Sequence, residues 1–529
     1  MSISDPHTID AGFRWQLPST FNFSADVVDR WAEDPERLAL IAVDSKGLEQ
    51  RFTYAEIAQR VSQLANLLAA CGLKKGDRLI VMLPRIPEWQ ISMVAATRMG
   101  LVPIPCITML TASDLEYRVK HSGARGVITL DSEAEKFEGL DDLRVRVSVG
   151  AAPEGWVAFD QLDHQSADFE PAPVAIEDLA ILYYTSGSTG LPKGVAHAAR
   201  ALWAWSSSAI HWLGLESNDR IWCTADTGWS KAGTSILFGP WSRGASVFFY
   251  DGPFEARKRF ELLSRYEITC FCAAATELRR LILEDVSKID LGQLRSTVSA
   301  GESVNPEIID RWRELTGTTV LDGYGQTETL MTVTNRPTAP IKAGSMGKAL
   351  PGVSVAVRTA EGNVATSSAE GELLIQLPNP QIMLSYWDDA ERTDATRIEL
   401  SGRQWFATGD NVEIDGDGYV FYTGRADDII NSSGYRIGPQ EVENALVGHP
   451  AVQECAVVGI ADRERGELVK AWVVLKNGFL AGEDLVGELQ GYAKKKTAPY
   501  KYPRRVAFVD ELPKTVTGKI QRNLLRERG

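Results

Sequence analysis

The chain has 529 residues, more than a single hydrophobic core can organise, so at least two domains are expected. Hydrophobic residues make up 44% of the chain and charged residues 24%, which favours a folded protein over a disordered one. The net charge of −14 argues against nucleic acid as a partner.

The first clear elements lie between residues 53 and 106. Thr53 and Glu56 form a capping-box pattern, and apolar residues then recur at helical spacing until Gly72, which predicts a helix that ends there. A continuously apolar stretch at 78–83 predicts a buried strand, and a helix from about Pro87 and a strand at 101–106 follow it. This β-α-β order continues past residue 300, so an α/β fold is expected.

A loop rich in glycine and hydroxyl residues follows a predicted buried strand at 178–184. Its residues that could contact phosphate are Thr185, Ser186, Gly187, Ser188, Thr189, Gly190 and Lys193. The glycines allow close backbone approach, the hydroxyls donate hydrogen bonds and the lysine supplies charge, so the loop predicts a polyphosphate site. Lys193 precedes Gly194 rather than Ser or Thr, which disfavours a Walker loop and transfer of a γ-phosphate.

The last third of the chain differs from the rest in composition and in predicted secondary structure. Residues 345–424 are rich in glycine and short strands, which predicts a small β unit. A compact tail follows, with a helix at 439–447 and strands around 456–460 and 470–475. We therefore place the domain boundary at residues 425–428, between an N-terminal domain at 1–424 and a C-terminal domain at 429–529.

The phosphate loop resembles that of the acyl-adenylate-forming superfamily, and further motifs of that superfamily occur in the same order. These are Ser299-Ala-Gly-Glu302, Asp322-Gly-Tyr-Gly-Gln-Thr-Glu328, Thr408-Gly-Asp410, Gly424-Arg-Ala-Asp-Asp428, Ser433-Gly-Tyr-Arg436 and Pro513-Lys-Thr-Val-Thr-Gly-Lys519. Asp226-Thr-Gly-Trp229 most resembles the medium-chain acyl-CoA synthetases, a branch that also handles aryl acids. The resemblance implies a large N-terminal domain of α/β subdomains plus a small β unit, and a smaller mobile C-terminal α+β domain.

The resemblance also implies a two-step reaction. A carboxylate attacks the α-phosphate of ATP to give acyl-AMP and pyrophosphate, and the thiol of coenzyme A then displaces AMP. Negative charge accumulates in the first step, so cations are the main catalytic requirement. In the family, a lysine at the position of Lys519 bridges the acyl carboxylate and ATP, and the tail rotates about a hinge that matches Asp427.

Further roles follow from the same motifs. Lys519, Lys193, Thr185 and Glu328 are the candidate catalytic residues, with Glu328 as the Mg²⁺ ligand because a hard cation prefers carboxylate and phosphate oxygens. Helix capping by an acid is the alternative for Glu328. The implied nucleotide ligands are Thr185, Ser186, Gly187, Ser188, Thr189, Gly190, Lys193, Gly301, Glu302, Asp322, Gly323, Tyr324, Gly325, Gln326, Thr327, Asp410 and Arg425.

The coenzyme A and acyl sites are less specific in the sequence. The candidates for coenzyme A are Ser433, Gly434, Tyr435, Arg436, Arg465, Lys501, Tyr502 and Arg504, although solvated surface charge explains the last four equally well. Trp229, Gly301 and Gly323 are the candidates for the acyl group, with a core role as the alternative for Trp229. His197 lies close to the phosphate loop, but an isolated histidine is more often structural.

Other functions stay open in the sequence. They are a stand-alone adenylation enzyme that loads a separate carrier protein, a luciferase-like oxidative enzyme and a catalytically silent nucleotide-binding protein. The chain ends ten residues after Lys519, so no fused carrier is expected. Retention of Lys193, Glu328 and Lys519 argues against the silent protein.

The cellular setting is inferred from what the sequence does not contain. Its six cysteines lack metal-ligand spacing, which indicates a reducing compartment, and Cys270 and Cys272 read as part of a buried strand. No apolar stretch reaches transmembrane length, and the first ten residues lack a leader pattern, so we expect a cytoplasmic protein with no membrane span. A monomer and a homodimer are both left open.

Overall fold

The computed structural model describes residues 13–185, 191–302, 304–425, 428, 430–432, 435–463, 465–497, 501–514 and 520–528. Contacts divide the chain into a first unit, Met1–Ser354 with Leu377–Arg397, and a second unit, Val355–Gln376 with Ile398–Gly529. The mixed α/β class predicted from the sequence is confirmed. Among the helices described, none combines the length and apolar character needed to span a bilayer.

A nine-stranded sheet forms the centre of the first unit and carries several of the predicted motifs. Its order is β16-β15-β14-β13-β12-β10-β11-β1-β2, with parallel pairing from β14 to β1 and antiparallel pairing at both ends. The strands are β1 (Leu38–Asp44), β2 (Glu49–Thr53), β10 (Arg220–Cys223), β11 (Ser246–Asp251), β12 (Cys270–Cys272), β13 (Ser296–Ala300), β14 (Val320–Gln326), β15 (Leu330–Thr334) and β16 (Lys348–Ala349). The predicted strand that contains Cys270 and Cys272 is confirmed and buried.

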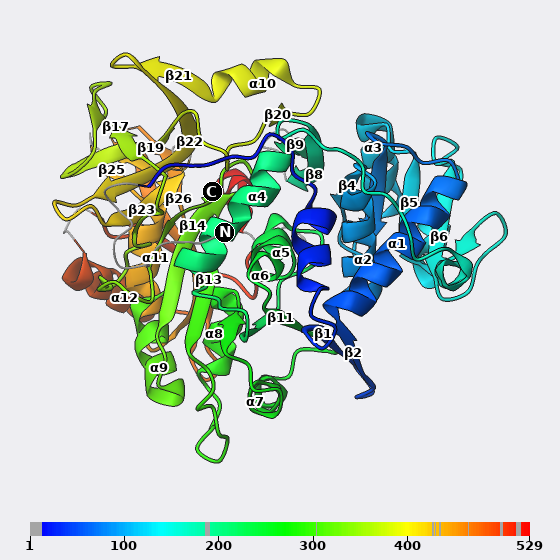
Figure 1. The fold of residues 1–529 in the computed structure, drawn as a ribbon. Coiled ribbons are helices and arrows are strands. Elements are labelled where there is room, and N and C mark those ends of the chain that lie inside the picture. Colours follow the sequence, from blue (N-terminus) through cyan, green and yellow to red (C-terminus); the bar gives the residue numbers. More distant parts are fainter. Residues whose placement is uncertain are drawn as a thin grey trace. The chain divides into compact units, whose positions relative to one another are not determined.

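The predicted β-α-β unit forms a second, parallel sheet in the order β4-β3-β5-β6-β7. Its strands are β3 (Arg78–Met82), β4 (Val102–Pro105), β5 (Gly126–Leu130), β6 (Val145–Val149) and β7 (Val157–Ala158). Helix α2 (Pro87–Arg98) connects β3 to β4 and lies beside α1 (Tyr54–Ala70) (Figure 1). The predicted capping box is present, since Thr53 Oγ1 accepts from Glu56 N at 3.2 Å and Glu56 Oε2 accepts from Thr53 N at 2.7 Å.

The strand before the phosphate loop belongs to a third sheet, which is antiparallel. It has the order β20-β9-β8, with β8 (Leu179–Thr185), β9 (Lys193–Ala198) and β20 (Ser385–Tyr386). The sequence predicted the strand correctly. The loop leaves the end of this strand, as predicted, but the antiparallel partner of the strand was not predicted, because apolar strands of parallel and antiparallel sheets can have the same pattern.

The other helices of the first unit are short to medium in length. The α-helices are α3 (Ala112–Ser122), α4 (Ala199–His211), α5 (Ser230–Ser235), α6 (Phe238–Ser242), α7 (Ala256–Arg265), α8 (Ala275–Leu281), α9 (Pro306–Thr316) and α10 (Ala390–Ala395). Residues Ser24–Asp29 form a π-helix, and Asp131–Phe137 and Phe159–His164 are 3₁₀ helices.

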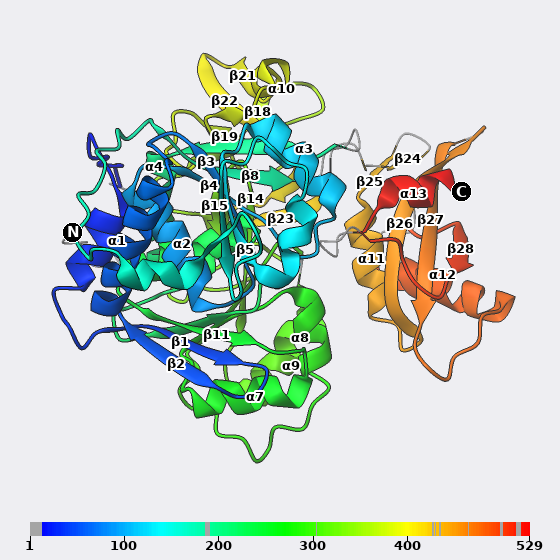
Figure 2. The same ribbon diagram turned by 90° about the vertical axis from the view of Figure 1, so that its right-hand side faces the viewer.

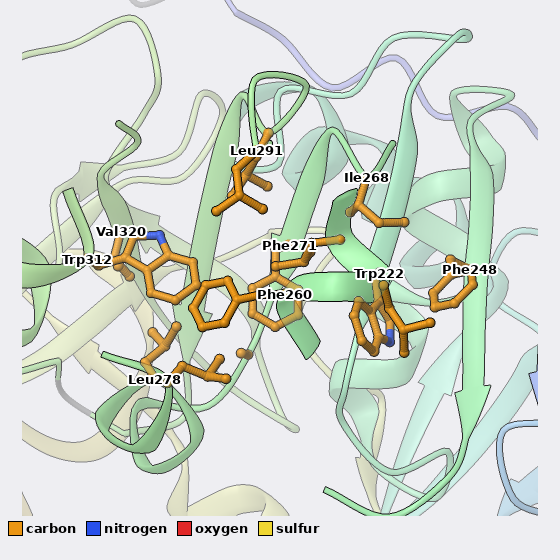
Figure 3. Close-up of a cluster of buried hydrophobic side chains, with 14 of the residues drawn as sticks. Trp222, Phe248, Phe260, Ile268, Phe271, Leu278, Leu291, Trp312 and Val320 are labelled. Carbon is orange, nitrogen blue, oxygen red and sulfur yellow. The ribbon is translucent and has the colours of Figure 1, made fainter. Parts of the chain in front are cut away.

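An aromatic core packs α7, α8 and α9 against the nine-stranded sheet (Figure 3). Trp222 of β10 lies between its cross-strand neighbours Phe248 and Phe271, with ring centroids 5.1 and 5.5 Å away. Trp312 of α9 stacks on Phe271 and on Phe260 of α7, at 6.1 and 5.7 Å. Such close packing of large rings holds the strand ends from which the site loops emerge.

The second unit contains two sheets. The first has the order β18-β17-β19-β22-β21 with β23 beside β22, and confirms the predicted small β unit. Its strands are β17 (Val355–Arg358), β18 (Val364–Ala365), β19 (Ala369–Gln376), β21 (Arg397–Leu400), β22 (Arg403–Ile414) and β23 (Val420–Arg425). The second sheet has the order β25-β24-β27-β26 with β28 beside β27, and consists of β24 (Ile430–Ser432), β25 (Tyr435–Ile437), β26 (Val452–Asp462), β27 (Gly466–Leu475) and β28 (Arg505–Phe508).

Side chains of β26 and β27 alternate between the two faces of this second sheet, and both faces are buried. Figure 2 shows α11, α12 and α13 around the sheet. Val457 and Val473 pack with α11 (Pro439–Val447) and α12 (Glu483–Lys496), whereas Val458 and Trp472 pack with α13 (Arg522–Glu527). The predicted helix at 439–447 and both predicted tail strands are confirmed. The boundary predicted at residues 425–428 stays a prediction.

A short loop after β10, residues 226–229, is held by the ends of two strands of the parallel sheet. Thr227 Oγ1 donates to the carbonyl of Leu83, after β3, at 2.5 Å. Gly228 lies against the end of β4, where an added Cβ would be 2.6 Å from the carbonyl carbon of Cys106. This close approach fixes the start of α5 and the position of Trp229.

We expect Gly228→Ala to lower the free energy of unfolding by about 1–3 kcal/mol or more, because the backbone of Cys106 cannot move aside as a side chain could. Urea denaturation measures the change. Gly487→Ala in α12 is the matched control, since its Cβ would meet open space and alanine favours a helix by up to about 1 kcal/mol. Equal stability of the two variants would contradict the proposed close approach.

Candidate functional site

An ion pair between Lys193 and Glu328 is the centre of the candidate site. Lys193 is the first residue of β9, and Glu328 lies in the turn between β14 and β15. Lys193 Nζ is 2.7 Å from Glu328 Oε1. The structure thus brings together the cation of the phosphate loop and the predicted metal ligand, which belong to different sheets.

Tyr386 of β20 completes this cluster. Its hydroxyl accepts a hydrogen bond from Lys193 Nζ at 2.9 Å and donates to Glu328 Oε1 at 2.8 Å. The ammonium group also lies 4.5 Å from the centre of the tyrosine ring, a distance suited to a cation–π contact. Sequence reasoning missed Tyr386, because nothing in its local pattern shows which distant residues its hydroxyl meets.

The cluster keeps Glu328 ionised although the residue is only 7% exposed. Burial raises the pKa of the Glu328 carboxyl, but the charge of Lys193 and the hydrogen bonds from Lys193 and Tyr386 outweigh burial. The pKa therefore lies below its ordinary value. A buried carboxylate with a movable cationic partner can exchange that partner for a metal ion.

Thr185 lies opposite Lys193 in the β8–β9 ladder. Its Oγ1 is buried, and within the described part of the chain it has no hydrogen-bond partner. A buried hydroxyl without a partner is uncommon, so it is available to a ligand such as a phosphate oxygen. The predicted phosphate-loop residues Ser186, Gly187, Ser188, Thr189 and Gly190 lie outside the described residues.

The predicted adenine loop coincides with strand β14 and the turn after it. Asp322, Gly323, Tyr324, Gly325 and Gln326 are on the strand, and Thr327 follows it. Burial raises the pKa of Asp322 to about 7, even though backbone N–H groups and Lys231 favour its charged form. Its Oδ1 accepts from Gly323 N at 2.9 Å, so this carboxyl stabilises its own strand.

Two of the three predicted acyl contacts, Gly301 and Gly323, lie at or beside the end of β13. Ala300 is the cross-strand partner of Gly323 and directly precedes Gly301, which has a φ of 93°. Lys231 Nζ donates to the Ala300 carbonyl at 3.1 Å and so ties the start of α5 to this strand end. Glu302 follows in the same segment and is half-buried.

Trp229 precedes α5 and is partly buried against a hydrophobic cluster that includes Ile104 and Ile107. Its Nε1 is buried, and no described residue accepts a hydrogen bond from it. The contacts are compatible with both roles considered from the sequence, an acyl contact and a packing residue. Its role stays a prediction.

His197 lies four residues after Lys193, so both side chains are on the same face of β9. The carbonyl of Thr327 is 2.6 Å from His197 Nε2 and can only accept, so Nε2 carries the proton. Burial lowers the pKa of His197 to about 4, and its ring is neutral near pH 7. Complete burial supports the structural role that the sequence favoured.

The predicted ribose ligands meet in the second unit. Asp410 of β22 and Arg425 of β23 are cross-strand partners, and Arg425 Nη1 is 3.2 Å from Asp410 Oδ1. The structure thus brings together two residues to which the motifs assigned the same sugar. Vicinal hydroxyls prefer a carboxylate acceptor, and Arg425 keeps this one oriented.

The candidates for coenzyme A are spread over the second unit. Lys501 Nζ is paired with Glu441 Oε2 at 2.5 Å, and Tyr502 Oη accepts from Arg504 at 2.7 Å. Arg465 lies in the turn between β26 and β27. The backbone of Tyr435 and Arg436 is in β25. Ser433 and Gly434 lie outside the described residues, as do the predicted hinge Asp427 and the predicted catalytic Lys519.

Comparison with known families gives two matches in this chain. The AMP-binding enzyme family matches residues 27–387, and the AMP-binding enzyme C-terminal domain matches residues 441–519. The first match includes β8, β9, β14 and β20, and with them Lys193, Glu328 and Tyr386. The resemblance inferred from the motifs is confirmed.

Individual relatives cover nearly the whole chain. The mitochondrial acyl-coenzyme A synthetase ACSM4 of Homo sapiens is 41% identical and covers 97% of this chain and 91% of its own. The anthranilate CoA ligase AuaEII, solved with anthranoyl-AMP, has a TM-score of 0.87 and 32% identity, covering 97% and 98% of the two chains. A benzoate CoA ligase from Burkholderia xenovorans LB400 has a TM-score of 0.83 and 30% identity, covering 96% and 100%.

We expect His197 to make stability depend on pH between about 6.5 and 4. Its folded pKa of about 4 lies below the ordinary 6.5, so the unfolded chain binds a proton first. Stability from this group is complete above pH 6.5 and falls by about 1.4 kcal/mol per pH unit toward pH 4. Urea denaturation of wild type and His197→Gln at several pH values measures the difference.

The control for this experiment is His164→Gln, at an exposed position. It should keep the wild-type dependence of stability on pH, because solvent reaches its ring in both states. If His197→Gln also keeps that dependence, the buried neutral ring is not the cause.

Proposed function

The chain belongs to the AMP-binding enzyme family, and on this premise we propose the reaction and the residues that perform it. The protein is an ATP-dependent acid:CoA ligase. It joins a carboxylic acid to AMP with release of pyrophosphate, and then forms a thioester with coenzyme A with release of AMP. The observation that carries this conclusion is the Lys193–Glu328 pair, which places a cation and an ionised carboxylate beside the phosphate loop.

The arrangement suits attack at the α-phosphate. A carboxylate is a poor acyl donor to a thiol, because its oxygen is a poor leaving group, and joining it to AMP corrects this. The approach of carboxylate to phosphate brings negative charges together, so fixed cations lower the barrier. We assign Lys193 to the phosphates and Lys519 to the carboxylate and α-phosphate, with Asp410 and Arg425 on the ribose.

Mg²⁺ fits the donor set around Glu328. This ion is usually held by one or two carboxylates together with substrate phosphates. Glu328 is a buried carboxylate that stays ionised, and we propose that it holds the ion. Mg²⁺ bound there would neutralise phosphate charge. Thr185 Oγ1, which has no hydrogen-bond partner among the described residues, can donate to a phosphate oxygen.

We propose a medium-chain or aryl acid as the substrate. Support comes from the relatives named for anthranilate and benzoate, and from the partly buried indole of Trp229 directly before α5. A flat indole favours flat or short acyl groups. We also propose a hinge at residues 425–428 around Asp427. We propose a cytoplasmic location as well, because none of the six cysteines forms a disulfide and thiols persist in reducing compartments.

The stoichiometry of the products tests the reaction, and Lys519→Ala tests its first step. Wild type should form AMP, pyrophosphate and acyl-CoA in equal amounts, measured by chromatography and a pyrophosphate assay over aliphatic and aromatic acids. Lys519→Ala should reduce acid-dependent pyrophosphate release by about 10²–10³-fold, the loss expected for one electrostatic stabiliser. Thioester formation from presynthesised acyl-AMP should continue near the wild-type rate.

Two outcomes would contradict this assignment. Formation of ADP and phosphate would exclude α-phosphate attack. An equal loss in both half-reactions of Lys519→Ala would remove the specific role of Lys519.

Trp229→Ala tests the acyl site. If the indole contacts the acid, the variant should lose about 1–3 kcal/mol of transition-state stabilisation with a preferred small acid and relatively favour longer acids. The measurement is kcat/KM over an aliphatic series and benzoate, with the melting temperature alongside. A uniform fall for all acids together with a lower melting temperature would identify Trp229 as a packing residue.

A further inference from the structure

A short segment, residues 383–387, joins the two halves of the Lys193–Glu328 site through its backbone. Met383 N donates to the Glu328 carbonyl at 2.8 Å. Trp387 N donates to the carbonyl of Gly194, next to Lys193, at 2.8 Å. Tyr386 lies between these anchors, and its own N–H donates to Thr393 Oγ1 at 2.9 Å. The backbone that carries Tyr386 is thus held by β9 on one side and by the turn that contains Glu328 on the other.

The two hydrogen bonds that join the Tyr386 hydroxyl to Lys193 and Glu328 have only one arrangement. An ammonium group can only donate and an ionised carboxylate can only accept. The hydroxyl therefore accepts from Lys193 Nζ at 2.9 Å and donates its single proton to Glu328 Oε1 at 2.8 Å. This makes the tyrosine a bridge between the two charges as well as a packing residue.

We propose that Tyr386 is a positioning residue that holds the Glu328 carboxylate in place when Lys193 leaves it for the phosphates of ATP. The inference rests on the proposed function, since it concerns the assigned metal ligand of that reaction. It adds a third residue, from a part of the chain after the recognised nucleotide motifs around residues 193 and 328.

The need for such a residue follows from the ion pair itself. Lys193 cannot serve the phosphates and stay 2.7 Å from Glu328 Oε1 unless the nucleotide lies against both groups. When the ammonium moves, the hydroxyl remains as a donor to Oε1, because its backbone is held by Glu328 and Gly194. The carboxylate then keeps its orientation, with Oε1 hydrogen-bonded to Tyr386, while it binds a divalent cation.

Loss of the hydroxyl would affect both charges. Glu328 is nearly buried and would depend more on Lys193, so the ammonium would be harder to release to the phosphates. The carboxylate would also be free to rotate after that release. Both effects weaken binding of the metal–ATP complex without touching the acid or coenzyme A.

The simpler explanation is that Tyr386 only fills space. It is 6% exposed, and its ring lies near the cationic groups of Lys193 and Arg392, at 4.5 and 5.8 Å. Tyr386→Phe separates the two explanations, because phenylalanine keeps the ring, its packing and its cation–π contacts and removes only the hydroxyl. A packing role predicts little change in metal binding.

The first experiment measures binding without turnover. Mn²⁺ binding to the full-length protein with ATP and no acid is followed by electron paramagnetic resonance. Tyr386→Phe should weaken this binding by about 10- to 100-fold, the range for a lost hydrogen bond to a charged group. The matched control is Tyr54→Phe, where a fully buried hydroxyl donates to the Ala245 carbonyl at 2.9 Å, and binding should stay at the wild-type level.

The second experiment separates the half-reactions. Tyr386→Phe should slow acid-dependent pyrophosphate release at limiting Mg²⁺ by a similar 10- to 100-fold, and excess Mg²⁺ should recover most of the rate. Thioester formation from presynthesised acyl-AMP and coenzyme A should stay within about twofold of wild type, because no metal–ATP complex is needed there.

A double-mutant cycle with Glu328→Gln identifies the residue through which Tyr386 acts. In the Glu328→Gln background, Tyr386→Phe should change Mn²⁺ binding by no more than about twofold. A full additional loss in that background, or unchanged Mn²⁺ binding in the single variant, would overturn the inference. If wild type itself releases no pyrophosphate with any acid, the proposed function fails instead, and the Mn²⁺ measurement still decides the role of Tyr386.

Discussion

The Lys193–Glu328 ion pair is the interaction on which the candidate site depends. Removing two charges from water costs several kcal/mol per ion, and their attraction offsets that cost only while both are present. A metal–ATP complex carries both signs, with phosphates for the lysine and a divalent cation for the carboxylate. The site can therefore exchange an internal ion pair for a ligand of matched charge without leaving a buried charge alone.

The pair also explains how separate sheets form one site. β9 belongs to the antiparallel three-stranded sheet, whereas the turn with Glu328 follows β14 of the nine-stranded sheet. On the same face of β9, Lys193 reaches Glu328, and His197 donates to the carbonyl of Thr327 at 2.6 Å. One contact is ionic and exchangeable, and the other is neutral and buried. The turn can thus be held by His197 while Lys193 changes partner.

Local patterns in the sequence predicted local structure well. The capping box at Thr53 and Glu56 and the helix at 439–447 depend on neighbouring residues, and both are present. The antiparallel partner of β8 could not be predicted, because strand pairing is settled by residues far away in sequence. The role of Tyr386 could not be predicted for the same reason. It depends on contacts of its hydroxyl with one atom of β9 and one atom of the turn after β14, both far away in sequence. Motif resemblance identified Lys193 and Glu328 as candidates because both residues lie within recognisable motifs.

Two carboxyl groups of one motif, those of Asp322 and Glu328, differ in pKa because different groups surround them. Asp322 and Glu328 are equally buried, each 7% exposed, and burial raises the pKa of both. Asp322 is met mainly by backbone N–H groups, and its pKa rises to about 7, whereas the nearby ammonium of Lys193 brings that of Glu328 below its ordinary value. Near neutral pH the first carboxyl is therefore protonated in a large fraction of molecules, and the second is ionised. The second carboxylate is already paired with a cation that a metal ion could replace, which is why we propose Glu328, at the end of this motif, as the divalent-ion ligand rather than Asp322 at its start.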